Sequence, residues 1–119
     1  MKKIKVGING LGRIGRAIFR IIDENHDLEI VAVNDIDPLI ENHAYLLNYD
    51  SLYGTLPGKV TCNTDNLFHK GKKIKFHSQD KISNVPWEDV GVNVVIDSSG
   101  IFQNVIDSHK IVDKNIFMS

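Results

Sequence analysis

Three glycines near the amino terminus have the spacing of a phosphate-binding turn. Residues 10–15 read Gly-Leu-Gly-Arg-Ile-Gly, which is the pattern G-x-G-x-x-G. The pattern follows a β-prone run and precedes a helix-like repeat, the context in which it binds the pyrophosphate of a dinucleotide. Gly10 would permit the tight turn, Gly12 would let a phosphate approach the backbone, and Gly15 would let helix and strand pack closely. A glycine-rich turn that only connects two elements is the alternative interpretation.

A carboxylate farther along the chain supports the dinucleotide interpretation. Asp35 follows a second β-prone run, where it can accept hydrogen bonds from the hydroxyls of an adenosine ribose, although a turn cap is the alternative. The N–H groups around Arg13 and Ile14, at the positive end of the helix, would face the phosphates. Asp35 would repel a 2′-phosphate, and residues 36–39 contain no Arg or Lys to accommodate one. The sequence therefore favours NAD over NADP.

The elements that must position these groups follow in the order of a βαβ unit. Residues 4–8 predict a strand, and the run at 28–33 predicts a second strand that is buried on both faces. Between them, helical spacing predicts a solvated face that carries Arg16 and Arg20. The apolar stripe of the same helix is expected to be Leu11, Ile14, Ile18, Ile21 and Ile22. A second helix is expected over residues 37–47, with Asp37 as its N-cap and Pro38 as its first residue.

The remainder predicts an antiparallel excursion that returns to a parallel sheet. Short strands are expected at 59–62, 67–69 and 73–77, with a tight turn at 70–72. Later elements are a buried strand at 92–97, a helix at 103–112 and a strand at 115–118. The chain is therefore expected to be one α/β domain over residues 1–119, with a mostly parallel sheet that is incomplete at its C-terminal end.

Composition narrows the possible partners. The chain has 119 residues, of which 42% are hydrophobic, and its 14 basic and 15 acidic residues leave a net charge of −1. This balance gives no net attraction to nucleic acid or anionic lipid, so the lysines of residues 70–75 are interpreted as a solvated hairpin. We expect no signal peptide and no membrane span, because polar residues interrupt every apolar stretch. A single Cys excludes an internal disulfide, which favours a soluble cytoplasmic protein.

The glycine-rich segment carries a more specific signal. Residues 5–16, Lys-Val-Gly-Ile-Asn-Gly-Leu-Gly-Arg-Ile-Gly-Arg, closely resemble the opening of phosphorylating glyceraldehyde-3-phosphate dehydrogenase. Further family landmarks follow in order at residues 31–35, 49–51, 86–87 and 97–100, so the resemblance covers essentially the whole chain. It implies a doubly wound Rossmann domain with strand order 3-2-1-4-5-6. It also implies an enzyme that oxidises and phosphorylates D-glyceraldehyde 3-phosphate in glycolysis, with NAD and phosphate as further ligands.

The resemblance also assigns cofactor contacts by position. It places Arg13 and Ile14 at the pyrophosphate, Asn9 beside the glycine turn, Asn34 and Asp35 at the adenosine, Ser99 and Gly100 at the next strand end, and Ser119 near the nicotinamide ribose. Ser99 stands where the family commonly has Thr, and it keeps the hydroxyl. The family's adenine-side Arg has no counterpart at residues 79–82. Family members are usually homotetramers, and residues 49–51 would lie near a subunit contact.

The catalytic groups of the family are expected beyond Ser119. The family uses a Cys thiolate as nucleophile and a His as general base. Cys62 lies between two β-like stretches and is interpreted as a structural residue. The five His have no metal-ligand spacing, so no metal site is predicted. Residues 1–119 alone are therefore expected to bind NAD without catalysing the reaction.

Three alternatives stay open at this stage. Erythrose-4-phosphate dehydrogenase is a close relative whose distinguishing residues lie mostly outside this sequence. A stand-alone nucleotide-binding module without catalytic activity is a second possibility, from a different functional class. Nucleic-acid binding through Lys72 and Lys73 is a third, and the neutral net charge makes it the weakest.

Overall fold

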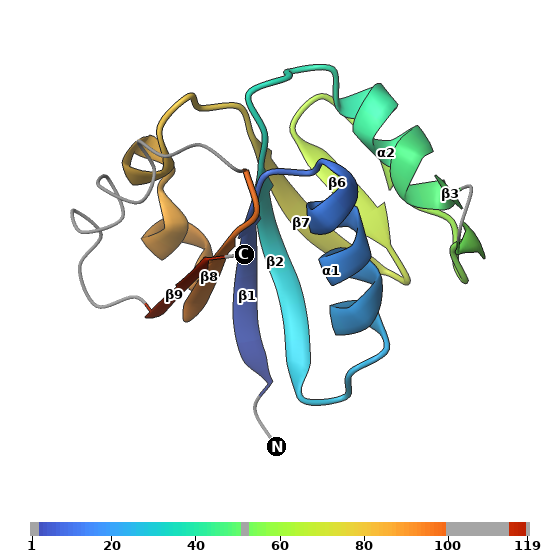
Figure 1. Ribbon diagram of the computed structural model, residues 1–119, viewed down its shortest axis with the longest axis horizontal. Coiled ribbons are helices and arrows are strands. Elements are labelled where there is room, and N and C mark those ends of the chain that lie inside the picture. The colour runs from blue at the N-terminus through green and yellow to red at the C-terminus, as the bar shows by residue number, and fades with distance from the viewer. Residues whose placement is uncertain (1–2, 51–52, 100–114, 119) are drawn as a thin grey trace.

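A seven-stranded sheet is the centre of the computed structural model, which describes residues 3–50, 53–99 and 115–118 (Figure 1). Its strands are β1 (Ile4–Asn9), β2 (Leu28–Asn34), β5 (Thr61–Cys62), β6 (Asn66–His69), β7 (Lys72–His77), β8 (Val94–Asp97) and β9 (Asn115–Met118). They lie in the order β5-β6-β7-β2-β1-β8-β9; the β5–β6 and β6–β7 pairs are antiparallel, and the remaining pairs are parallel. The parallel strands, numbered along the chain, read 3-2-1-4-5. This order confirms the doubly wound α/β fold with an antiparallel excursion.

The two faces of the sheet are covered differently. The helices α1 (Arg13–Asp23) and α2 (Ile40–Asn48) pack on one face, where Phe19 and Leu47 join the larger core cluster. The short 3-10 helices η1 (Ile82–Asn84) and η2 (Trp87–Val90) cover the other face and supply a second cluster. A separate pair, β3 (Tyr49–Asp50) and β4 (Gly54–Thr55), follows α2. Each helix of the described residues is too short or too polar to cross a bilayer.

On the second face of the sheet, the indole ring of Trp87 packs against β1. The ring lies so close to Gly7 that a Cβ on that glycine would be 2.6 Å from it. The indole N–H donates to the carbonyl of Ile82 at 3.1 Å, so this buried polar group is satisfied. The glycine at position 7 is therefore needed for close packing on the face opposite α1 and α2.

The β1 and β2 register contains an irregularity that matters for the strand ends. Val6 pairs with Ile30 and Gly7 pairs with Ala32, so β2 has one extra residue at this point. Such a bulge bends the strand and resets the alternation of its side chains. Beyond it, the pairing continues to the last residues of both strands, where Asn9 faces Asn34.

The buried stripe of α1 differs from the expectation. Gly15, Phe19 and Ile22 are buried, whereas Ile14 is 55% exposed and Ile21 is 67% exposed. Ile14 and Ile21 are seven residues apart and share a face about 100° from that of Gly15. The prediction that these two isoleucines are buried is wrong, because the close packing of Gly15 on the preceding turn sets the rotation of the helix.

The face of α1 expected to be solvated also makes specific contacts. Arg16 donates to the carbonyl of Leu11 at 3.0 Å. Arg20 donates to the carbonyls of Leu47 and Gly54, at 3.2 and 2.6 Å. Carbonyls at the end of α2 have no intrahelical donor, so a guanidinium that reaches them ties the two helices together. The interpretation of both arginines as merely solvated is therefore wrong.

The second helix begins later than predicted. α2 starts at Ile40, and its N-cap position is Leu39, so the assignment of Asp37 and Pro38 to the helix start is wrong. Instead, the carboxylate of Asp37 accepts the N–H of Leu39 at 3.0 Å, while its own N–H is donated to Asp35 at 2.9 Å. Two successive Asx turns thus occupy the segment before the helix.

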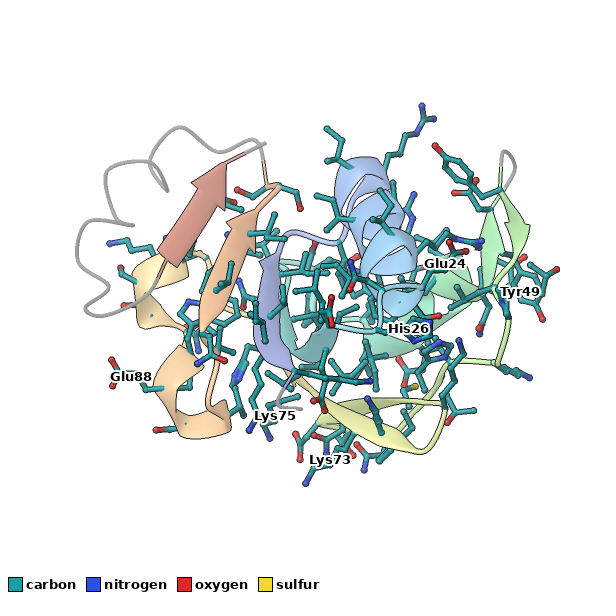
Figure 2. All side chains as sticks on the ribbon, turned by 90° about the horizontal axis from the view of Figure 1, so that it is seen from below. Glu24, His26, Tyr49, Lys73, Lys75 and Glu88 are labelled. Carbon is teal, nitrogen blue, oxygen red and sulfur yellow. The ribbon has the colours of Figure 1, made fainter. Side chains whose placement is uncertain are left out.

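The hairpin and the last strand agree with the predictions. Lys70 and Gly71 join β6 to β7 with φ angles of 51° and 77°, as a two-residue hairpin turn requires. Figure 2 shows Lys73 and Lys75 at the outer edge of this region, consistent with a solvated hairpin. β9 occupies the predicted residues, and the expected helix at 103–112 lies outside the described residues.

Candidate functional site

The glycine-rich turn joins β1 to α1 at the carboxyl edge of the sheet, drawn at the top of Figure 1. Gly10 has a φ of 98°, which side chains rarely adopt, and a Cβ there would lie 2.7 Å from the Cα of Ser99. A Cβ on Gly15 would overlap the carbonyl oxygen of Gly10. Around Gly12, by contrast, a Cβ would meet nothing within 4 Å. Two of the glycines are therefore required for packing, and the third leaves the backbone open to a ligand.

The start of α1 presents uncapped backbone donors beside this opening. The first intrahelical bond runs from the N–H of Arg16 to the carbonyl of Gly12 at 2.9 Å. The N–H groups of the preceding first turn have no carbonyl of their own helix to bond. Gly12 provides no side-chain cap, and the first turn contains no acidic residue. This helix end can therefore accept an anion such as a phosphate.

The carboxylate of Asp35 is held firmly at the end of β2. One oxygen, Oδ2, accepts the N–H of Leu11 at 2.8 Å, and Oδ1 accepts the N–H of Asp37 at 2.9 Å. The side chain is 17% exposed. Because a carboxylate has about four lone-pair positions, it can still accept hydrogen bonds from a vicinal diol. The bond from Leu11 also connects this carboxylate directly to the glycine turn.

A row of buried polar side chains runs across the carboxyl ends of the strands. Asn34 donates to the Oδ1 of Asn9 at 2.7 Å, and Asn9 donates to the Oδ1 of Asp97 at 3.1 Å. The hydroxyl of Ser99 donates to the same Asp97 oxygen at 2.7 Å. On the other side, the Oδ1 of Asn34 accepts the N–H of Gln79 at 2.8 Å. Side chains thus link the ends of β7, β2, β1 and β8 in addition to the backbone ladder.

These groups surround a cleft of about 160 Å³. Its lining comprises Asn9, Gly10, Gly12, Asn34, Asp35, Ile36, Gln79, Asp80, Ser98 and Ser99. Pockets that hold a whole small ligand usually have volumes of at least about 300 Å³. The described residues therefore enclose only part of a dinucleotide. A larger hollow, about 400 Å³, lies beside the outward face of α1 near Tyr53, away from the glycine turn.

Six of the eleven residues predicted to bind the cofactor line this cleft, namely Asn9, Gly10, Gly12, Asn34, Asp35 and Ser99. Arg13, Ile14 and Gly15 lie in the first turn of α1, next to the cleft in sequence but outside its lining. The predicted residues Gly100 and Ser119 lie outside the described residues. Sequence reasoning missed Ile36, Gln79, Asp80 and Ser98.

Ser98 shows why part of the cleft escaped prediction. Its hydroxyl donates to the carbonyl of Gly10 at 2.8 Å, and its N–H donates to the carbonyl of Asn9 at 2.8 Å. It therefore fixes the turn from a strand end that is 88 residues away in sequence. Its position beside Ser99 after a buried strand is the one available signal, because carboxyl ends of parallel strands share one edge.

His43, His69, His77 and Cys62 lie on four separate elements, and His109 lies outside the described residues. His69 is buried with its Nε2 3.0 Å from the Oδ1 of Asp23, and His43 is buried near Asp35. Burial lowers the pKa of His77 and raises the pKa of the half-buried Cys62 thiol on β5. The part of the chain that the structure describes brings no three His, Cys, Asp or Glu side chains together as a metal site.

Comparison with known proteins gives a consistent result. The family model for the glyceraldehyde 3-phosphate dehydrogenase NAD binding domain matches residues 4–105. Glyceraldehyde-3-phosphate dehydrogenase of Cochliobolus lunatus is 48% identical over 101 residues, which are 83% of this chain and 29% of that protein. The enzyme of Colletotrichum lindemuthianum is 45% identical over 107 residues, which are 88% of this chain and 31% of that protein. The chain thus spans less than a third of the length of these relatives.

Proposed function

Since the chain belongs to the glyceraldehyde-3-phosphate dehydrogenase family as an NAD-binding domain, we propose that the whole protein oxidises and phosphorylates D-glyceraldehyde 3-phosphate with NAD as hydride acceptor. One observation carries the cofactor half of this proposal. The open backbone at Gly12, the uncapped start of α1 and the carboxylate of Asp35 converge on one cleft at the carboxyl ends of β1 and β2. A phosphate and a ribose diol need donors and acceptors in this arrangement.

The individual cofactor contacts are part of the proposal. The first turn of α1, with Arg13 and Ile14, would bind the pyrophosphate through its N–H groups. Asp35 would accept from the ribose hydroxyls, which favours NAD because a 2′-phosphate would bring negative charge to this carboxylate. The remaining proposed cofactor-binding residues are Asn9, Gly10, Gly12, Gly15, Asn34, Ser99, Gly100 and Ser119.

The catalytic groups are proposed to come from sequence other than residues 1–119. Cys62 is the single cysteine of the chain. It lies on β5, four strands from β1, which is about 19 Å at the usual strand spacing. Burial also raises the pKa of its thiol, which disfavours the thiolate that would have to attack an aldehyde. Both observations support a structural role for this residue.

We further propose that the whole protein is a homotetramer in the cytoplasm. Tyr45, Tyr49 and Tyr53 are 60%, 49% and 64% exposed, and the rings of the first two are 5.0 Å apart. In Figure 2, Tyr49 lies at the rim of the molecule opposite β9. An exposed group of aromatic side chains is typical of a protein–protein contact, which supports a subunit contact near residues 49–51.

The test measures NAD reduction by the complete natural protein. D-glyceraldehyde 3-phosphate and erythrose 4-phosphate are supplied in parallel, with and without inorganic phosphate. The proposal expects phosphate-dependent NADH formation, fastest with the three-carbon aldehyde. A preference for the four-carbon aldehyde would assign the related dehydrogenase instead. NAD binding with no turnover of either aldehyde would assign a binding module without catalysis.

A further inference from the structure

His43 is a buried polar residue that the proposed cofactor contacts do not include. It lies on α2, is 4% exposed, and packs its ring on Phe76 with 5.4 Å between ring centroids. Its Nε2 atom points toward the segment that carries Asp35. We infer that His43 is a positioning residue that holds the ribose-binding carboxylate of Asp35 in place, and this inference rests on the proposed binding of NAD.

The hydrogen bond of His43 defines what the ring does. Its Nε2 lies 2.8 Å from the carbonyl oxygen of Asp37. A carbonyl oxygen only accepts, so Nε2 carries the proton and donates it. The same Nε2 lies 3.7 Å from the Oδ1 of Asp35, which is too long for a hydrogen bond but places the donor nitrogen beside that carboxylate.

This bond closes a loop of contacts around the Asp35 carboxylate. The N–H of Asp37 is donated to the Oδ1 of Asp35, and the carbonyl of Asp37 accepts from His43. Asp37, two residues after the proposed ribose-binding position, is thus held on both sides, once by the Asp35 carboxylate and once by α2. With the N–H of Leu11 on Oδ2, the carboxylate cannot turn without breaking one of these bonds. Its remaining lone pairs are then kept in a fixed orientation for a diol.

If the His43 side chain only filled space in the core, an apolar residue would be expected at this position. The other ring nitrogen, Nδ1, is buried and has no hydrogen-bond partner among the described residues. An apolar side chain of similar size would therefore fill the space against Phe76 with less desolvation. Within the described ranges the ring makes one hydrogen bond, and it goes to the segment that carries Asp35.

The experiment compares NAD affinity among variants of the complete natural protein by calorimetric titration. His43→Leu removes the donor and is expected to weaken NAD binding about three- to tenfold. His43→Gln, which keeps a donor at a similar reach, is expected to retain most of the affinity. His43→Asn is too short to reach the carbonyl and is expected to behave like His43→Leu. His26→Leu is the matched control, because His26 is exposed and lies near the end of α1 in Figure 2.

A double-mutant cycle separates positioning from general destabilisation. If His43 acts through Asp35, His43→Leu has no further effect on NAD affinity in an Asp35→Ala background. Additive losses, or equal affinities of the wild type and His43→Leu, would overturn the inference while leaving the proposed function intact. If His43→Leu does not fold, equal affinities of the Gln and Asn variants overturn it in the same way. A wild-type protein that does not bind NAD would overturn both.

Discussion

Alanine substitutions at Gly15 and Gly12 are expected to affect different properties of the protein. In Gly15→Ala, the new Cβ would overlap the carbonyl oxygen of Gly10 and lie 2.9 Å from its carbon. Both atoms belong to the backbone, so the turn itself must shift. In Gly12→Ala, the new Cβ meets nothing within 4 Å, and the φ of −74° is ordinary for alanine. The first substitution should affect folding, and the second should affect the ligand.

The expected magnitudes follow from these distances. Overpacking against rigid atoms costs about 3 kcal/mol, and the gain of alanine over glycine inside a helix returns about 1 kcal/mol. Gly15→Ala should therefore lower the free energy of unfolding by about 2 kcal/mol. For Gly12→Ala, the weaker N-cap and the reduced entropy of the unfolded chain nearly cancel, leaving a change within about 0.5 kcal/mol. A methyl group between the backbone and a phosphate should weaken NAD binding about ten- to a hundredfold.

Denaturant unfolding and NAD titration of both variants test this pair of predictions. For Gly15→Ala we expect a lower denaturant concentration at the unfolding midpoint and an unchanged m-value. For Gly12→Ala we expect weaker NAD binding and the wild-type midpoint. A Gly15→Ala protein that unfolds at the wild-type midpoint would refute the packing argument. A Gly12→Ala protein that binds NAD as tightly as wild type would refute the assignment of the pyrophosphate to this turn.

Three further predictions concern single side chains. Asp35→Ala should weaken NAD binding about tenfold or more and reduce the preference for NAD over NADP, while Asp65→Ala, at an exposed position, should change neither. Because burial raises the pKa of Cys62, iodoacetamide should alkylate it more slowly than glutathione at about pH 8, and equal rates would contradict its burial. Because burial lowers the pKa of His77 below 6.5, the unfolded chain binds more protons, so the free energy of unfolding should fall as pH drops through about 6.5. His77→Phe should flatten that pH dependence, and an unchanged slope would contradict the assignment.

Local spacing was sufficient to predict some features and insufficient for others. The glycine turn and the Lys70–Gly71 hairpin are each encoded within a few residues, because the positive φ angles at Gly10, Lys70 and Gly71 restrict the residue types. The rotation of α1 is different. Apolar residues form two overlapping stripes at helical spacing, one with Ile14 and one with Phe19. A contact between Gly15 and the preceding turn decides between them, and periodicity does not contain that contact.

The missed site residues have long-range partners. Gln79 bonds Asn34 across 45 positions, and Ser98 bonds the carbonyl of Gly10 across 88. A serine or glutamine at the end of a strand has many possible partners, and only the strand order selects one. The start of α2 is a different case, because its contact is local: the carboxylate of Asp35 accepts the N–H of Asp37, two residues on, and this turn stands where the helix start was expected.

The strand ends also explain why the cleft and the sheet must form together. Asn9 is buried, and it bonds Asn34 on one neighbouring strand and Asp97 on the other. Leaving such a buried amide without partners costs about 1–3 kcal/mol, so the end of β1 is stable in this position only when β2 and β8 both lie beside it. The glycine turn starts from that strand end and is held by Ser98, which directly follows β8. If NAD binds at this turn as proposed, linkage predicts that it also stabilises the pairing of β1 with β8 against unfolding.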